Sequence, residues 1–164
     1  MTVLLRLATE NDLPLMLAWR SIEKVYQGFY TQGRENRSLN WEEHWKWWHT
    51  TSDWKHWIIQ LNDGQRTRDV GVIALRDLCA WNPEMGIYIG EVSLWGHGVG
   101  KKALQLALDW LKERSKSHCR TTVLKSNERA IRLFESSEFK RIGGARDGEW
   151  SYQINISNKT GFKE

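Results

Sequence analysis

The stretch Trp95-Gly96-His97-Gly98-Val99-Gly100-Lys101-Lys102-Ala103-Leu104 places three glycines at alternate positions between two apolar segments. The segment before it, 85–89, reads Met-Gly-Ile-Tyr-Ile and predicts a short strand. The segment after it predicts a helix, because apolar residues recur there at the spacing of one helix face, at Leu104, Ala107, Leu108 and Leu111. The glycines therefore form a strand-to-helix turn.

Such a turn has two interpretations. Free backbone N–H groups at a helix N-terminus attract anions, and glycine lets a phosphate approach the backbone closely. Glycine equally serves a plain turn that needs a positive φ. The residues of the turn alone do not decide between an anion cradle and a turn.

The glycine spacing argues against two nucleotide-binding motifs. A P-loop needs four residues between its glycines and a hydroxyl after its lysine, whereas Gly96 and Gly100 are separated by three residues and Lys101 is followed by Lys102. A dinucleotide fingerprint needs Gly-x-Gly-x-x-Gly early in a βαβ unit, whereas this stretch reads Gly-x-Gly-x-Gly past the middle of the chain.

The composition is that of a globular domain. The chain has 164 residues, of which 40% are hydrophobic and 27% charged. We expect one domain over 1–157 and a frayed polar tail over 158–164. No apolar run is long enough to cross a bilayer and no leader is evident, so we expect a cytoplasmic protein without a membrane partner.

The net charge and the cysteine content restrict the kinds of partner and ligand that we expect. The net charge is +4 and the basic residues are spread along the chain, so we expect no nucleic-acid partner; a basic rim around a polyanionic small molecule explains the same charge. Cys79 and Cys119 are isolated and fit no metal-ligand spacing, so we expect no metal site. We expect both thiols to be reduced and buried, the alternatives being a disulfide or a nucleophile.

Hydrophobic periodicity and turn residues predict an α/β domain around one mixed sheet. We expect about seven strands and about four helices, with a partly helical segment at 21–38 that carries three aromatic residues, including Tyr30. The strands are expected at 3–8, 54–61, 68–75, 84–89, 118–125, 139–142 and 149–156. The helices are expected at 13–19, at 41–50, from the glycine turn to about 116, and from 127 through at least 134.

Tryptophan is unusually abundant. The chain has 11, and five of them lie between Trp41 and Trp54. Trp41, Trp45 and Trp48 recur at helical spacing, and we expect most of them to pack on the sheet while one or two reach a bound ligand. His44 and His49 lie on or near the same helix and are either pocket residues or surface histidines.

Two motifs resemble those of the GNAT acyltransferase superfamily. The first is 95–100, which precedes a helix and resembles the family's motif Gln/Arg-x-x-Gly-x-Gly/Ala. The second is 127–139, Asn-Glu-Arg-Ala-Ile-Arg-Leu-Phe-Glu-Ser-Ser-Glu-Phe, which resembles Asn-x-x-Ala-x-x-Leu-Tyr-x-x-x-Gly-Phe. Order, separation and predicted elements also agree. The Trp-rich helix and the run 86–91 are similar to the branch that acetylates ribosomal-protein N-termini and small amines.

The resemblance implies a GNAT-type single domain that binds acetyl-CoA as co-substrate. The turn would hold the pyrophosphate on its backbone amides, with Trp95 at its entry, and the strand end near Ile89 would bind the pantetheine arm. Asn127 would contact the cofactor near the thioester, and Ala130 would leave room for it. The pyrophosphate site implied in this way consists of Gly96, His97, Gly98, Val99, Gly100 and Lys101.

The chain departs from the family pattern at three positions. Trp95 replaces Arg or Gln, and Glu138 replaces the glycine before Phe139. Phe134 takes the place of the tyrosine that is often the general acid for the departing thiolate, and phenylalanine has no proton to give. Either water or another donor protonates the thiolate, or transfer is slow.

The resemblance implies direct attack of an amine on the thioester, which needs a base to take the amine's proton. We expect Glu84 in this role, with Glu91 as the second candidate. For the acceptor wall we expect Tyr30, Trp41, His44 and Trp45, because aromatic faces suit a cation or a sugar ring.

Three functions are compatible with these residues and motifs. The first is N-acetylation of a small-molecule amine such as an amino sugar or a polyamine. The second is acetylation of a protein N-terminus, and the third is an acetyl-CoA-binding module that has lost catalysis. A homodimer is expected by analogy with relatives.

Overall fold

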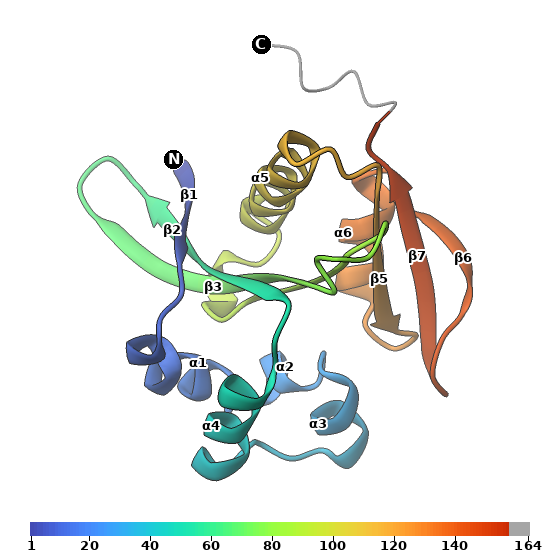
Figure 1. The fold of residues 1–164 in the computed structure, drawn as a ribbon. Helices are drawn as coiled ribbons and strands as arrows, with labels where there is room; N and C mark the ends of the chain where they lie inside the picture. The colour runs from blue at the N-terminus through green and yellow to red at the C-terminus, as the bar shows by residue number, and fades with distance from the viewer. Residues whose placement is uncertain (158–164) are drawn as a thin grey trace.

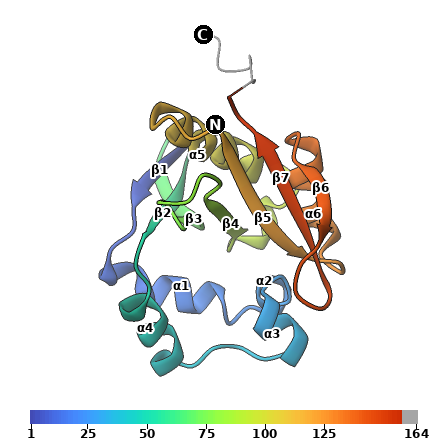
Figure 2. The same ribbon diagram turned by 45° about the vertical axis from the view of Figure 1, so that its right-hand side comes forward.

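The computed structural model describes residues 1–157 and contains one seven-stranded sheet with helices on both faces (Figures 1 and 2). The sheet order is β1-β2-β3-β4-β5-β7-β6, and β4 and β5 are parallel whereas the other neighbouring pairs are antiparallel. The strands are β1 (Thr2–Leu7), β2 (Trp54–Asn62), β3 (Thr67–Arg76), β4 (Glu84–Ile89), β5 (His118–Leu124), β6 (Lys140–Gly144) and β7 (Glu149–Asn155). The predicted mixed sheet is confirmed.

Six α-helices and two short 3-10 helices connect the described strands. The α-helices are α1 (Leu13–Trp19), α2 (Glu23–Tyr26), α3 (Tyr30–Glu35), α4 (Trp41–Thr50), α5 (Val99–Glu113) and α6 (Glu128–Ser136). The 3-10 helices are η1 (Glu10–Asp12) and η2 (Val92–Leu94). The four expected helices are present, and the segment at 21–38 adds α2 and α3. In Figures 1 and 2, α1 to α4 gather below the sheet and α5 lies on its other side.

Alternating side chains give the sheet a core on each face. From β2, Trp57 and Ile59 point into the larger core with α5, whereas Ile58 points into a smaller core with α1. The apolar face predicted for α5 supplies the larger core, since Leu104, Ala107, Leu108 and Leu111 are each no more than 1% exposed. Each buried leucine contributes roughly 1.5–3 kcal/mol of transfer free energy.

The β4–β5 pair holds together only at its start. One pair of residues, Glu84 and Arg120, is in register, and the Thr121 hydroxyl donates to the Met85 carbonyl at 2.7 Å. The other edge of β4 pairs with β3 along 84–89, and the Gly90 N–H continues this pairing with a bond to the Val70 carbonyl at 2.8 Å. The two parallel strands therefore separate toward their carboxyl ends and leave a gap in the middle of the sheet.

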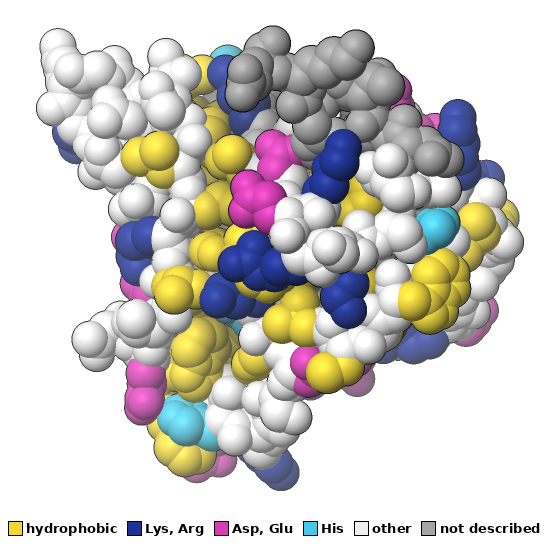
Figure 3. Space-filling view, turned by 45° about the horizontal axis from the view of Figure 1, so that its top comes forward, with side chains coloured by type: hydrophobic (Ala, Val, Ile, Leu, Met, Phe, Trp, Pro, Cys, Tyr) yellow, Lys and Arg dark blue, Asp and Glu magenta, His cyan; other side chains and the backbone are white. Residues whose placement is uncertain are grey.

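The predictions for the two cysteines and for the tail have different outcomes. Cys119 is buried as expected, but Cys79 is exposed, because it lies in the loop after β3 instead of in the core. The expected tail at 158–164 lies outside the described residues. No helix within residues 1–157 has the length and apolarity needed to cross a membrane. On the face in Figure 3, basic side chains lie among acidic and hydrophobic ones.

Candidate active site

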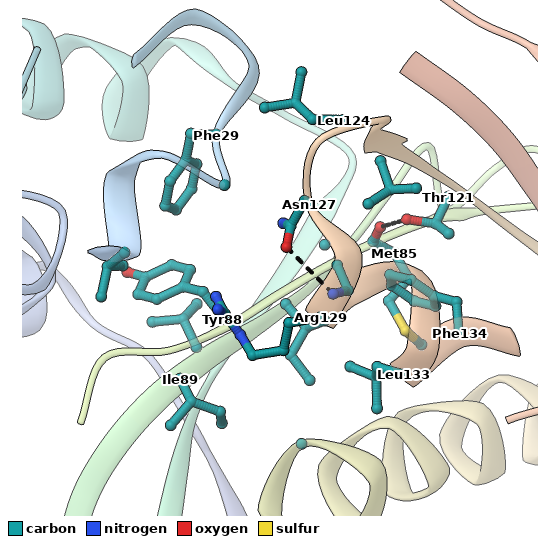
Figure 4. Close-up of a pocket in the computed structure, with 18 of the residues that line it drawn as sticks. Phe29, Met85, Tyr88, Ile89, Thr121, Leu124, Asn127, Arg129, Leu133 and Phe134 are labelled. Atoms are coloured by element: carbon teal, nitrogen blue, oxygen red, sulfur yellow. Dashed lines mark hydrogen bonds between the residues drawn. The ribbon is translucent and has the colours of Figure 1, made fainter. Parts of the chain in front are cut away.

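A cavity of ≈ 840 Å³ occupies the gap between β4 and β5 and reaches both faces of the sheet (Figure 4). The alternation along β4 explains this extent. Ile87 and Ile89 point toward the α5 and α6 side, where they pack against the larger core. Tyr88, between them, points toward the α1 to α4 side and packs against the smaller core. We call the first part the cofactor half and the second the acceptor half.

The glycine turn forms one end of the cofactor half. Gly96 and Gly98 both have φ of +82°, and the space beside each of them, where a side chain would lie, is open to 4 Å. Helix α5 begins directly after Gly98, and the Lys102 N–H bonds to the Gly98 carbonyl at 3.2 Å. The N–H groups of the first turn of a helix have no intrahelical acceptor, so those before Lys102 face this open space. The geometry is that of an anion cradle and favours it over a plain turn.

Helix α6 forms the opposite wall of the cofactor half. Its N-terminus is capped by Asn127, whose side-chain oxygen accepts the Ala130 N–H at 3.2 Å (Figure 4). The cap uses the oxygen, and the amide nitrogen lies beside Gly28, 3.0 Å from where a Cβ at that position would be. Phe134 is 3% exposed and packs edge-on against Phe139 at 5.1 Å between ring centroids. This wall therefore has an apolar ring at the position where the resembled motif has a tyrosine.

Trp95 links the glycine turn to the end of β4 and to α6. Its indole N–H donates to the Ile89 carbonyl at 2.9 Å. The Arg129 guanidinium lies 3.2 Å from the centroid of the Trp95 indole. The strand end expected to bind the pantetheine arm thus already has an internal donor at its last carbonyl.

The acceptor half is lined by side chains from α1, α4, β2 and the segment between α2 and α3. The aromatic residues are Phe29, Tyr30, Trp47, His56 and Tyr88. Tyr30 lies between two arginines, with the Arg146 guanidinium 3.7 Å and the Arg34 guanidinium 5.1 Å from its ring centroid. These contacts connect α3 to the loop between β6 and β7 and close one side of the cavity.

The Trp-rich helix presents a different face from the one expected. The Asn40–Glu43 capping box starts α4 as predicted, but His44 is fully buried and Trp47 lines the cavity. Trp41 and Trp45 are 46% and 45% exposed, so the expectation that most of the evenly spaced tryptophans pack on the sheet is wrong for these two. Trp41, His44 and Trp45 all lie outside the cavity lining, whereas Tyr30 belongs to it.

Two histidines that pack against Trp47 are held neutral. His44 stacks on Trp47 at 5.4 Å and its Nε2 bonds to the Leu13 carbonyl at 3.1 Å. Burial, with a smaller effect of the Arg20 charge, lowers the pKa of His44 to about 4. His56 lies against Trp47 and Trp54, and burial lowers its pKa to about 3, with smaller effects of two arginines.

The two carboxylates expected as bases have partners elsewhere. Glu84 lies at the closed end of the gap, 3.9 Å from Arg76 and 4.0 Å from Arg120, and its carboxylate accepts the Thr122 hydroxyl at 3.5 Å. Glu91 pairs with Arg68 at 3.1 Å. Neither belongs to the cavity lining.

Glu149 is the carboxylate of the described chain that lines the cavity. It opens β7, opposite Leu124 at the end of β5, and it is 3% exposed. Arg146 donates to it from Nε at 2.8 Å and from a terminal nitrogen at 3.3 Å. No motif marks Glu149 in the sequence, because it reaches the site through the β5–β7 register.

The described residues offer no metal site. Within residues 1–157, no three His, Cys, Asp or Glu side chains are grouped so that they can hold a metal ion.

Comparison with known proteins identifies the family. The family model for the GNAT acetyltransferase domain matches residues 2–140. An uncharacterized protein of Methanocaldococcus jannaschii is 40% identical over 154 residues, which are 94% of this chain and 31% of that protein. The chain thus spans about a third of the length of this curated relative. A crystal structure of a domain from the same organism superimposes with a TM-score of 0.90 at 40% identity and covers 94% of this chain and 98% of the domain.

More distant structures share the fold. The aminoglycoside acetyltransferase AAC(6')-Ib with ribostamycin and coenzyme A superimposes with a TM-score of 0.83 at 19% identity, covering 98% of both chains. The spermidine N-acetyltransferase of Vibrio cholerae with CoA and spermine gives a TM-score of 0.73 at 16% identity, covering 94% of this chain and 96% of that one.

Proposed function

We propose that this chain, which belongs to the GNAT family of acetyltransferases, is an acetyl-CoA-dependent N-acetyltransferase whose acceptor is the primary amine of a small molecule. The observation that carries this proposal is the continuous cavity of ≈ 840 Å³. Its acceptor half is roofed by α1 to α4 and bounded by aromatic rings. Such a cavity is of the size that encloses a small ligand.

The cofactor half supplies the groups for acetyl-CoA. The backbone amides of Gly96 and of 98–101 suit the pyrophosphate, whereas the His97 N–H already bonds to the Leu94 carbonyl at 3.2 Å. Lys101 adds a positive charge beside them. Ile89 and Ala130 border the path to the gap, where the Asn127 amide nitrogen is free to donate. When bound, acetyl-CoA supplies the activated acetyl group.

The chemistry requires a proton to leave the amine while a C–N bond forms and the C–S bond of the thioester breaks. We assign the proton to Glu149, directly or through one water, because its carboxylate lies in the cavity. Glu84 and Glu91 remain the alternatives and are separated from Glu149 by substitution. Phe134 donates no proton, so the thiolate takes its proton from water or from the protonated base.

Thiol release tests the proposal. Acetyl-CoA is mixed with the protein and a panel of amino sugars, amino acids, polyamines and N-terminal peptides, and free thiol is followed. Turnover of a small amine above the peptides supports the proposal. Turnover of peptides alone contradicts it. Tight acetyl-CoA binding without thiol release from any acceptor supports the alternative that Phe134 suggests, a binding module without catalysis.

A further inference from the structure

Arg20 is a partly buried cation in the acceptor half. It caps the C-terminus of α1, and its guanidinium lies 4.0 Å from the centroid of the Phe29 ring and 5.7 Å from the centroid of the Trp47 indole. Its Nε donates to the Gln32 side-chain oxygen at 2.9 Å. The side chain thus has one neutral hydrogen-bond partner and two aromatic neighbours, and it lines the cavity.

Arg20 has no carboxylate partner within the described residues, unlike the other arginines of this half. Arg76 has Glu84 at 3.9 Å, and Arg146 has Glu149 at 2.8 Å. No acid lies within 4.0 Å of Arg20, and its two terminal nitrogens donate to no described acceptor. Burial, together with the nearby Arg76 charge, lowers the pKa of Arg20 to about 10, which leaves it positive at neutral pH. A partly desolvated charge without an ionic partner is costly, so a ligand that supplies one gains affinity.

A second donor, which is buried, lies in the same part of the cavity. The Tyr88 hydroxyl is buried and has no hydrogen-bond partner among residues 1–157. The Tyr88 ring contacts the Phe29 ring edge-on at 5.1 Å (Figure 4). Phe29 is also the ring that Arg20 covers. The phenol stays protonated, since burial raises its pKa. Buried polar groups are almost always paired in native proteins, so the unpaired Tyr88 hydroxyl, beside the ring that Arg20 covers, indicates a missing acceptor.

We propose that the acceptor amine also carries an anionic group, a carboxylate or a phosphate, which the Arg20 guanidinium and the Tyr88 hydroxyl bind. This inference rests on the proposed small-molecule function and specifies the substrate class. The anion is held on the acceptor face of β4, away from the glycine turn, so it is distinct from the phosphates of the cofactor. Polycationic amines, such as the polyamines and aminoglycosides bound by the distant structures, bring a second positive charge to Arg20 and are poor acceptors here.

A matched set of amines tests the charge requirement. Glucosamine, glucosamine 6-phosphate and glucosaminic acid share an amine on a six-carbon skeleton and carry no anion, a phosphate and a carboxylate respectively. Calorimetry at saturating CoA keeps the cofactor's own phosphate site filled. We expect at least one of the two anionic amines to bind about ten- to a hundredfold tighter than glucosamine, because hydrogen bonds to charged groups are worth more than neutral ones. The better of the two identifies the anion. Equal or weaker binding of both overturns the inference.

Variants separate binding by Arg20 from a structural role. Arg20→Met removes the charge at similar length and is expected to abolish the preference for the anionic amine, while Arg20→Lys keeps part of it. Tyr88→Phe is expected to reduce it a few-fold. Arg114→Met is the matched control, because Arg114 stacks on Trp110 away from the cavity. Unchanged CoA affinity shows that each variant is folded. A preference that survives in Arg20→Met overturns the inference.

Turnover of the same amines distinguishes this inference from the proposed function. If glucosamine and spermidine are acetylated as well as the anionic amines, the inference fails and the small-molecule function stands. If only N-terminal peptides are acetylated, the small-molecule function fails. The anion site then stands only if Arg20→Met removes a preference for an acidic over a neutral second residue.

Discussion

The two halves of the cavity are built in different ways. The cofactor half relies on backbone amides of one contiguous turn, fixed by glycines with φ of +82° and by the start of α5. The acceptor half relies on side chains from α1, α4, β2, β4 and β7, which meet only in the folded chain. A contiguous backbone site suits a cofactor that is the same for every member of a family. A site assembled from distant side chains lets the acceptor change with few substitutions.

The largest effect is expected from the acid that faces the acceptor half. Glu149→Gln removes a base while keeping size and one acceptor oxygen, so kcat should fall about 100- to 1,000-fold, within the usual range for general base catalysis. Binding of acetyl-CoA, which uses the other half, should not change. Steady-state thiol release gives kcat, and calorimetry gives the cofactor affinity.

Glu84→Gln and Glu91→Gln complete this test. Both carboxylates pair with arginines and neither belongs to the cavity lining, so we expect each change to lower kcat less than tenfold. A larger loss in either one than in Glu149→Gln would move the base to that residue.

The next largest effect is expected from a substitution in the cofactor half alone. Gly98→Asp puts a carboxylate at the cradle and a side chain at a positive φ, so acetyl-CoA affinity should fall about a hundredfold, or roughly 2.7 kcal/mol. Gly64→Asp is a matched control, because Gly64 has φ of +96° in the β2–β3 hairpin with open space around it. It should lower stability by a similar amount and leave cofactor affinity unchanged. Equal affinity losses in both variants would show that backbone strain alone, not the cradle, controls binding.

This contrast explains how much of the site the sequence predicted. The turn, its helix and the sheet around it follow from local spacing, and the apolar face of α5 was correct residue by residue. No sequence pattern predicts that Arg20 and Glu149 belong to the site. Each is a single residue whose place depends on a helix end or on strand register more than 20 residues away.

The prediction for the Trp-rich helix was wrong for another reason. With tryptophans at 41, 45, 47 and 48, hydrophobicity alone does not say which side of the helix is buried. The packing of α4 on α1 decides it by burying His44, whose ring bonds to the Leu13 carbonyl. A histidine inside and two tryptophans outside reverse the usual preference, and only the neighbouring helix accounts for that.

Substitutions of Trp47 and Trp45 test this difference within one helix, and their expected effects are smaller. Trp47→Leu removes part of the acceptor wall and should raise the KM for the acceptor about tenfold, with little change in the KM for acetyl-CoA. Trp45→Leu alters the exposed side and should stay within about 0.5 kcal/mol of wild type in stability and activity. A higher acceptor KM in Trp45→Leu than in Trp47→Leu would place the acceptor on the outer face of α4.

The smallest effect at neutral pH is expected at His56, and it grows as the pH falls. Its pKa of about 3 in the folded protein lies below the 6.5 of the unfolded chain, so the unfolded state binds more protons below pH 6.5. Stability is therefore full above about pH 6.5 and declines toward pH 3. The loss is about 2 kcal/mol at pH 5, at 1.36 kcal/mol per pH unit. Urea unfolding of wild type and His56→Leu from pH 7 to pH 5 measures this difference.

The same measurement compares the two halves. His56→Leu should flatten the decline, because leucine has no charge to bury among the tryptophans around it. His97→Gln changes an exposed ring in the glycine turn and should leave the decline as it is in wild type. This outcome would assign the loss of folding stability at low pH to the acceptor half, where His56 lines the cavity and has a lowered pKa. An equal flattening by His97→Gln would assign it to the cofactor half instead.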